Sequence, residues 1–136
     1  AYLLARAVQF FTPGIPQVYY VGLLAGENDI ELVNATKNGR DINRHVYSIE
    51  EIQTAVERTV VQELFGLMRL RNTHPAFEGE IKLLDSSDTV LSIKWIRDEL
   101  ALRLDADFAN TAYTITETRD GVDRQLHRSV KRSRDI

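Results

Sequence analysis

The sequence contains no cysteine, and only three prolines, one methionine and one tryptophan among its 136 residues. The absence of cysteine excludes disulfide bonds, thiolate metal ligands and a cysteine nucleophile, and it favours a cytoplasmic protein. No apolar run approaches the roughly 18 residues that a membrane-spanning helix needs, so no membrane partner is expected. The chain also lacks internal repeats and low-complexity segments.

Charge of neither sign dominates, because 17 Lys and Arg residues stand against 20 Asp and Glu residues, for a net charge of −3. That balance predicts no general affinity for nucleic acid. The three histidines lie far apart and have no carboxylate at ligand spacing, so we expect no metal site. Hydrophobic residues make up 43% of the chain, which is enough for a core. Because the chain starts inside a helical pattern without an initiator Met, we expect a piece of a larger protein.

Pro13, Gly14 and Pro16 end a helix predicted for residues 1–11, because proline fixes φ and removes a backbone donor. Residues 17–21 follow as Gln-Val-Tyr-Tyr-Val, which is β-branched, aromatic and apolar on both faces. This pattern is typical of a short strand that is buried on both sides, as in a parallel sheet covered by helices.

A short helix and a polar loop come after the predicted strand. We expect the helix over residues 30–35, with Asn28 as its N-cap and a left-handed turn at Asn38-Gly39 as its end. Residues 40–45, Arg-Asp-Ile-Asn-Arg-His, are dense in hydrogen-bond donors. A buried strand that leads into such a loop is the layout of an α/β barrel rim, where active sites lie.

The remainder of the chain changes from a helical to a β pattern. Capping boxes at Ser48 and Thr59 begin two predicted helices. From residue 79 the apolar residues alternate with polar ones, and short turns separate the predicted strands. Trp95 follows this alternation together with its neighbours, so we interpret it as a core residue rather than a platform for sugar stacking.

Three motifs carry a family resemblance. The run GIPQVYYVGLLAGEND (residues 14–29) resembles the segment that follows the seventh barrel helix in the α-amylase superfamily of glycoside hydrolases. The runs GRDINRH (39–45) and RLRNTHPAF (69–77) narrow the resemblance to the sucrose phosphorylases within that superfamily. The resemblance covers about residues 1–80.

The resemblance, together with the patterns above, predicts an α/β plus all-β chain in three parts. Residues 1–78 are predicted to be the C-terminal part of a (β/α)8 TIM barrel, with its last strand and helices. Residues 79–118 are predicted to form a small antiparallel β domain. Residues 119–136 are predicted to be a polar tail, solvated or disordered, since their basic residues have no interleaved aromatics for base stacking.

The resemblance implies an enzyme that cleaves sucrose reversibly with phosphate, giving fructose and α-glucose 1-phosphate without a cofactor. Retaining chemistry of this kind needs a carboxylate nucleophile and a carboxylic acid/base about 5 Å apart. The family's motifs for both groups, and for a third aspartate, are missing here, so we expect no catalytic residue and no activity from this chain alone. A slice of a barrel exposes strand edges and apolar faces, which favours association, so a homodimer is an expectation.

The residues predicted to bind substrate lie in the loops after the predicted strand. Arg40 leads, because in the resembled family an arginine of the GRD motif reaches the glucosyl pocket, where its guanidinium can bind a carboxylate and a hydroxyl together. Arg44 is the alternative, because related enzymes carry a similar arginine doublet. Asp29 and His45 are further candidates, although Asp29 could instead cap a helix and His45 could be a packed loop residue.

Two other interpretations stay open. A sister phosphorylase acting on glucosylglycerol, glucosylglycerate or sucrose 6-phosphate would share the glucosyl side and differ at the acceptor loops. A non-catalytic sugar-binding or scaffold module is the other, with the helices only linking the β domain.

Overall fold

The computed structural model describes residues 1–129, which form two compact units. The sheet unit comprises residues 1–16 together with the chain from residue 67, and the loop unit comprises residues 17–66. This division differs from the predicted boundary at residue 78, because the first helix and the end of the longest helix group with the sheet.

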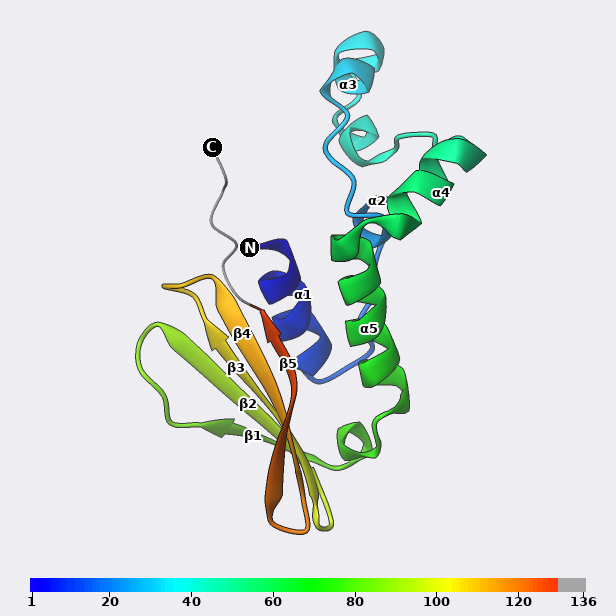
Figure 1. Cartoon of the computed structure of the whole chain (residues 1–136). Helices are drawn as coiled ribbons and strands as arrows, with labels where there is room; N and C mark the ends of the chain where they lie inside the picture. The colour runs from blue at the N-terminus through cyan, green and yellow to red at the C-terminus, as the bar shows by residue number, and fades with distance from the viewer. Residues whose placement is uncertain (130–136) are drawn as a thin grey trace. The chain divides into compact units, whose positions relative to one another are not determined.

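Five antiparallel strands form a meander in the sheet unit (Figure 1). Each strand is hydrogen-bonded to the next one in the sequence, so their order is β1-β2-β3-β4-β5. Their bounds are β1 Glu80–Leu84, β2 Val90–Arg97, β3 Leu100–Asp107, β4 Ala112–Arg119 and β5 Val122–Ser129. The prediction of a small antiparallel β domain is confirmed.

One face of the sheet makes the core. Leu102, Leu104 and Ala106 of β3 are fully buried on that face, and so is Ile115 of β4. Helix α1 (Tyr2–Phe11) contacts β3 and β4 and contributes four buried residues of its own. The alternation that predicted the strands is therefore the alternation between this apolar face and the opposite, polar one.

Trp95 is a core residue, as predicted. Only 7% of it is exposed, and its Nε1 donates a hydrogen bond to the Phe11 carbonyl oxygen at 2.8 Å. Phe77 meets the indole edge-on at 5.7 Å, and the Arg71 guanidinium lies 5.2 Å from the indole centroid. Because protein groups surround the ring, no face of it is open for a sugar.

Helix α5 (Thr59–Thr73) ends just before a 3-10 turn, η2 (Pro75–Glu78), where the proline at position 75 predicts an end. His74, between the two, accepts a hydrogen bond from the Ala76 amide and lies 3.0 Å from the buried carboxylate of Glu117 on β4. A buried carboxylate needs such a partner, so this contact fastens η2 to the sheet. None of the helices in the described part of the chain is long and apolar enough to cross a membrane.

The prediction of a polar tail from residue 119 is wrong for β5, which pairs with β4 from Val122 to Ser129. On this strand His127 stacks on Tyr113, with ring centroids 4.8 Å apart. An edge strand needs only one pairing partner and tolerates polar residues on both faces, which is why it showed no alternation. The remaining residues of the predicted tail, 130–136, lie outside the described residues.

The loop unit consists of short helices. They are α2 (Tyr20–Leu23), α3 (Ile30–Thr36), the 3-10 helix η1 (Gly39–Asn43), α4 (Ile49–Glu57) and the first part of α5. The strand predicted for residues 17–21 is wrong, since α2 begins within it. An extended segment needs a neighbouring strand for its N–H and C=O groups, and every strand of the described chain lies in the sheet unit.

The helix caps of the loop unit follow the sequence with small shifts. Ser48 and Glu51 form the predicted capping box at the start of α4. The N-cap of α3 is Asp29 rather than Asn28, and its left-handed end is Lys37, at φ 56°, rather than the asparagine-glycine pair after it.

Candidate functional site

The polar loop predicted to carry the site is held at its start by Asn38. The Asn38 side chain accepts a hydrogen bond from the Arg40 backbone N–H at 3.2 Å and donates one to Asp41 at 3.3 Å. The backbone of Arg40 is therefore fixed, whereas its side chain is exposed. Among residues 1–129 the Arg40 guanidinium has no hydrogen-bond or ion-pair partner. All its donors are available to a ligand.

Arg44, at the other end of η1, is partly engaged. Its Nη1 lies 3.7 Å from Asp41 Oδ1, and half of its side chain is exposed. An exposed pair at this distance adds little stability, but it does restrict where the guanidinium lies. The structure thus separates the two arginines that the sequence left as alternatives, one free and one tethered.

His45 lies between two carboxylates. Its Nδ1 is 3.0 Å from Asp29 Oδ2, and its Nε2 is 3.1 Å from Glu51 Oε1. Ionised carboxylates only accept hydrogen bonds, so both ring nitrogens must donate, which only the protonated imidazole can do. Both contacts raise the pKa of His45, the one with Asp29 first. The two carboxylates therefore favour the protonated form of His45 at the centre of the loop.

Backbone amides hold the two carboxylates in place as well. Asp29 accepts from the Leu32 N–H at 2.8 Å, and this bond, followed by the one to His45, lowers the pKa of Asp29. Glu51 accepts from the Ser48 N–H at 2.6 Å, which is the main cause of the lowered pKa of Glu51. Each carboxylate thus stabilises a helix N-terminus and the imidazolium at once.

Two further bonds connect this bridge to its neighbours. The Asp29 N–H donates to the Ile42 carbonyl oxygen of η1 at 2.9 Å. The Tyr20 hydroxyl donates to the His45 carbonyl oxygen at 3.0 Å, and the Tyr47 ring meets the imidazole edge-on at 4.6 Å. Four short elements, α2, α3, η1 and α4, are therefore joined at one histidine.

The structure brings Asp29, the N-cap of α3, into contact with His45, which follows Arg44 in the sequence. A direct contact between His45 and a ligand would require one ring nitrogen to leave its carboxylate. Two members of this cluster were missed by sequence reasoning. Glu51 was predicted only as a capping residue, and Tyr20 only as part of a strand. The capping spacing reveals the first bond of Glu51, but nothing in the sequence indicates its second, to a histidine six positions before it.

The candidate site offers a ligand the hydrogen-bond donors of Arg40 rather than a reacting group. Asp29 and Glu51 are both engaged with the same imidazolium, so neither is a free nucleophile or proton donor. Within the described residues, no group of three or more His, Cys, Asp or Glu side chains could hold a metal ion. The unused guanidinium of Arg40 offers a planar fork suited to hydroxyl and carboxylate oxygens. The arrangement is suited to binding a polar ligand.

The chain resembles several known proteins, although no family model matches it. It is 50% identical over 115 residues to a sucrose phosphorylase of Agrobacterium vitis, covering 85% of this chain and 24% of the relative. It is 45% identical over 128 residues to a glucosylglycerol phosphorylase of Marinobacter adhaerens, covering 93% of this chain and 27% of the relative.

A solved structure of a phosphorylase is also similar to this chain. The crystal structure of sucrose 6F-phosphate phosphorylase from Thermoanaerobacter thermosaccharolyticum matches with a TM-score of 0.87 and 47% identity, over 92% of this chain and 26% of that one. The chain thus spans about a quarter of the length of the relatives it matches.

Proposed function

Because this chain belongs to the glucoside phosphorylases that include the sucrose phosphorylases, we propose that it is the C-terminal part of an enzyme that transfers a glucosyl group to phosphate. The donor we propose is sucrose, with fructose and α-glucose 1-phosphate as products. The observation that carries this proposal is the exposed guanidinium of Arg40, which has no partner among residues 1–129 and lies in the GRDINRH motif that narrowed the family resemblance.

In this proposal Arg40 holds the glucosyl unit. Its fixed backbone and free side chain allow the guanidinium to bind a hydroxyl of the sugar and a carboxylate from another segment of the enzyme at the same time. Such charge-assisted bonds are worth about 1.5–3 kcal/mol each, so the loss of one would be seen clearly in the reaction rate.

The other predicted site residues act through the loop. Arg44 is restrained by Asp41 and contributes positive charge beside Arg40. Asp29 and His45 hold the loop in place through their mutual contact and through Glu51. We propose that these two residues position the arginines rather than contact the sugar first.

The bond changes are assigned to residues outside this chain. A carboxylate of the enzyme attacks the anomeric carbon of the glucosyl unit with inversion, while a carboxylic acid protonates the departing fructosyl oxygen. Phosphate then attacks the same carbon with a second inversion, so that the configuration is retained and no cofactor is needed. The loop unit would take part by binding, as part of the (β/α)8 barrel of the whole enzyme. Cytoplasmic location and a homodimer remain predictions.

The test is an assay of the whole enzyme with sucrose and inorganic phosphate, in which glucose 1-phosphate and fructose are measured. We expect both products in equal amounts. Phosphate-independent release of glucose, or no product from any glucoside offered, would contradict a phosphorylase.

A sister phosphorylase is the second candidate, because the relatives at 45% and 47% identity carry glucosylglycerol and sucrose 6-phosphate in their names. The same assay with these two donors separates the candidates. Glucose 1-phosphate formed from one of them but not from sucrose would move the assignment to that donor and leave the role of Arg40 unchanged.

A further inference from the structure

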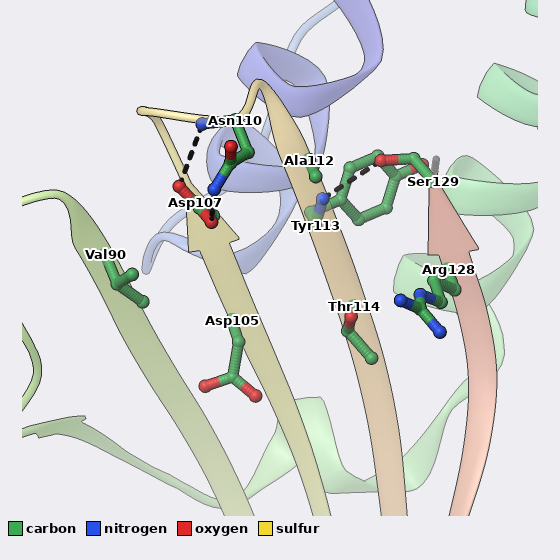
Figure 2. Close-up of a pocket in the computed structure, with 9 residues that line it drawn as sticks. All are labelled: Val90, Asp105, Asp107, Asn110, Ala112, Tyr113, Thr114, Arg128 and Ser129. Atoms are coloured by element: carbon green, nitrogen blue, oxygen red, sulfur yellow. Dashed lines mark hydrogen bonds between the residues drawn. The ribbon is translucent and has the colours of Figure 1, made fainter. Parts of the chain in front are cut away.

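The polar face of the sheet carries a hollow. Its lining residues lie between positions 90 and 129, far in the sequence from Arg40. Its volume is about 510 Å³, within the range of small-molecule sites. Figure 2 shows its wall and floor on β2 to β5, near the β3–β4 turn. Most of the lining residues therefore lie on strands, and only Asn110 lies in a turn.

A single cross-strand row explains the shape of the hollow. Asp105 of β3 is paired in register with Thr114 of β4, and Thr114 with Arg128 of β5. The two outer residues are charged, and Arg128 is also long, whereas Thr114 between them is short and uncharged. With strands about 4.8 Å apart, Asp105 and Arg128 stand about 10 Å from one another across the Thr114 floor. Figure 2 shows these three side chains on neighbouring strands.

The carboxylates at one wall are already oriented. Asp105 accepts a hydrogen bond from the Ser92 hydroxyl at 2.7 Å and lies 2.8 Å from the Arg103 guanidinium. Asp107, two residues on, accepts from the Asn110 amide N–H at 3.0 Å and from its side-chain NH₂ at 2.7 Å. Each carboxylate still has lone pairs for another donor.

The opposite wall has unused donors. Among residues 1–129 the Arg128 guanidinium has no hydrogen-bond or ion-pair partner, and the Thr114 hydroxyl has no hydrogen-bond partner. The hollow thus presents oriented acceptors on one side, free donors on the other, and a hydroxyl between them.

This combination selects the chemical class of the ligand. An anion would meet the two carboxylates Asp105 and Asp107, and a cation would meet Arg128. No group of three or more His, Cys, Asp or Glu side chains in the described residues could hold a metal ion. A neutral polyol satisfies both walls, because each hydroxyl can donate to a carboxylate and accept from a guanidinium. We propose that this hollow is a saccharide-binding subsite on the sheet, formed by Asp105, Thr114 and Arg128.

The experiment is a titration of the ¹⁵N-labelled full chain with methyl α-glucoside, followed by amide chemical shifts. We expect saturable shifts at Asp105, Thr114 and Arg128. Inorganic phosphate, titrated in parallel, should give no saturable shifts at these positions. Saturation by phosphate but not by the glucoside, shifts confined to the loop unit, or no shifts at all would each overturn the proposal.

Three variants sharpen the test. Arg128→Ala should weaken binding about tenfold, through the loss of one charge-assisted hydrogen bond. Thr114→Phe should abolish binding, because the ring fills the floor of the hollow. Lys94→Ala is the matched control, because Lys94 lies on the same face in the neighbouring row, paired with Arg103, and should bind as the unchanged chain does. All three must keep a dispersed amide spectrum. Equal loss in Lys94→Ala and Arg128→Ala would overturn the site.

Discussion

Each of the two units is stabilised internally by a different kind of interaction. In the sheet unit, apolar side chains from three adjacent strands and a helix are removed from water almost completely. In the loop unit, several large apolar side chains remain exposed, among them Ile30, Val46 and Ile49, and polar contacts around His45 join the short helices. Burial of apolar side chains stabilises the sheet unit, whereas hydrogen bonds between His45 and two carboxylates arrange the short helices of the loop unit.

The difference teaches where binding residues can be placed. Elements α3 and η1 contain no buried residue, so polar contacts with His45, rather than burial, arrange the segment that presents Arg40 at a fixed backbone position. Its order then depends on protonation, while that of the sheet depends on packing. Variants and pH changes should therefore affect the two units differently.

The largest effect should come from the core of the sheet. Leu104 is fully buried in a cross-strand row with Ile93 and Ile115. Leu104→Ala should lower the free energy of unfolding by about 2–5 kcal/mol, as lost burial and a cavity add up. Urea unfolding of the 136-residue chain measures it. Ile49→Ala in the loop unit, where the side chain is 70% exposed, should change stability by no more than about 0.5 kcal/mol. Similar costs for both variants would erase the contrast.

A smaller effect should follow from a close backbone approach at the start of the sheet. A Cβ at Gly79 would lie 1.9 Å from the Ile96 carbonyl oxygen, which belongs to the backbone of β2 and can move only if that strand shifts. Gly79→Ala should cost about 1–3 kcal/mol, as for overpacking. Gly66→Ala is its opposite, because a Cβ in that helical position meets nothing within 4 Å. It should stabilise the chain by about 0.5–1 kcal/mol. Thermal unfolding would refute the explanation if both variants shifted in the same direction.

The smallest effect is a pH dependence of amide-exchange protection. We expect a loss of protection at alkaline pH in the loop unit but not in the sheet unit. The pKa of His45 is raised, so its contribution is complete below the ordinary value of 6.5 and is lost as pH rises through the raised pKa. The lowered pKa values of Asp29 and Glu51 give contributions that are complete above 3.8 and 4.5 and fail as pH falls through the lowered values. Amide exchange in residues 38–45 should be slowest, after correction for intrinsic rates, between about pH 4.5 and 6.5.

The sheet unit provides the comparison for that pH profile. It holds Glu117, whose pKa is lowered chiefly by His74, so both units should lose protection in acid. Only the loop should lose protection in alkali, and His45→Gln should remove that alkaline change while leaving sheet amides unaltered. An unchanged profile in His45→Gln would show that the imidazolium does not hold the loop.

The sequence allowed the sheet to be predicted better than the loop for a physical reason. Strands β2, β3 and β4 alternate between a buried and a polar face, and that alternation is written locally in the sequence. β5 has no such alternation, because it is an edge strand with charged residues on both faces, so it was mistaken for a tail. The strand predicted at residues 17–21 failed because its pattern required pairing partners that the described chain does not provide.

The binding roles of the site residues stay predictions, but some of their local contacts could be predicted. The motif proposed Arg40 and Arg44, and capping spacing placed Ser48 with Glu51. The contact between His45 and Asp29 joins residues 16 apart and follows no periodicity, so only the fold could reveal it. Likewise, Arg128 became a candidate ligand-binding residue only because the structure shows β5 as a strand that pairs with β4 at Thr114.

The most direct test of the proposed binding role compares Arg40→Lys with Arg44→Lys in the whole enzyme, using kcat/KM for glucose 1-phosphate formation. Lysine keeps the charge but loses the planar fork. We expect Arg40→Lys to lower kcat/KM about tenfold, equivalent to about 1.4 kcal/mol, and Arg44→Lys to have a smaller effect. An unchanged kcat/KM in Arg40→Lys, or a larger loss in Arg44→Lys, would contradict the assignment of Arg40 to the glucosyl unit.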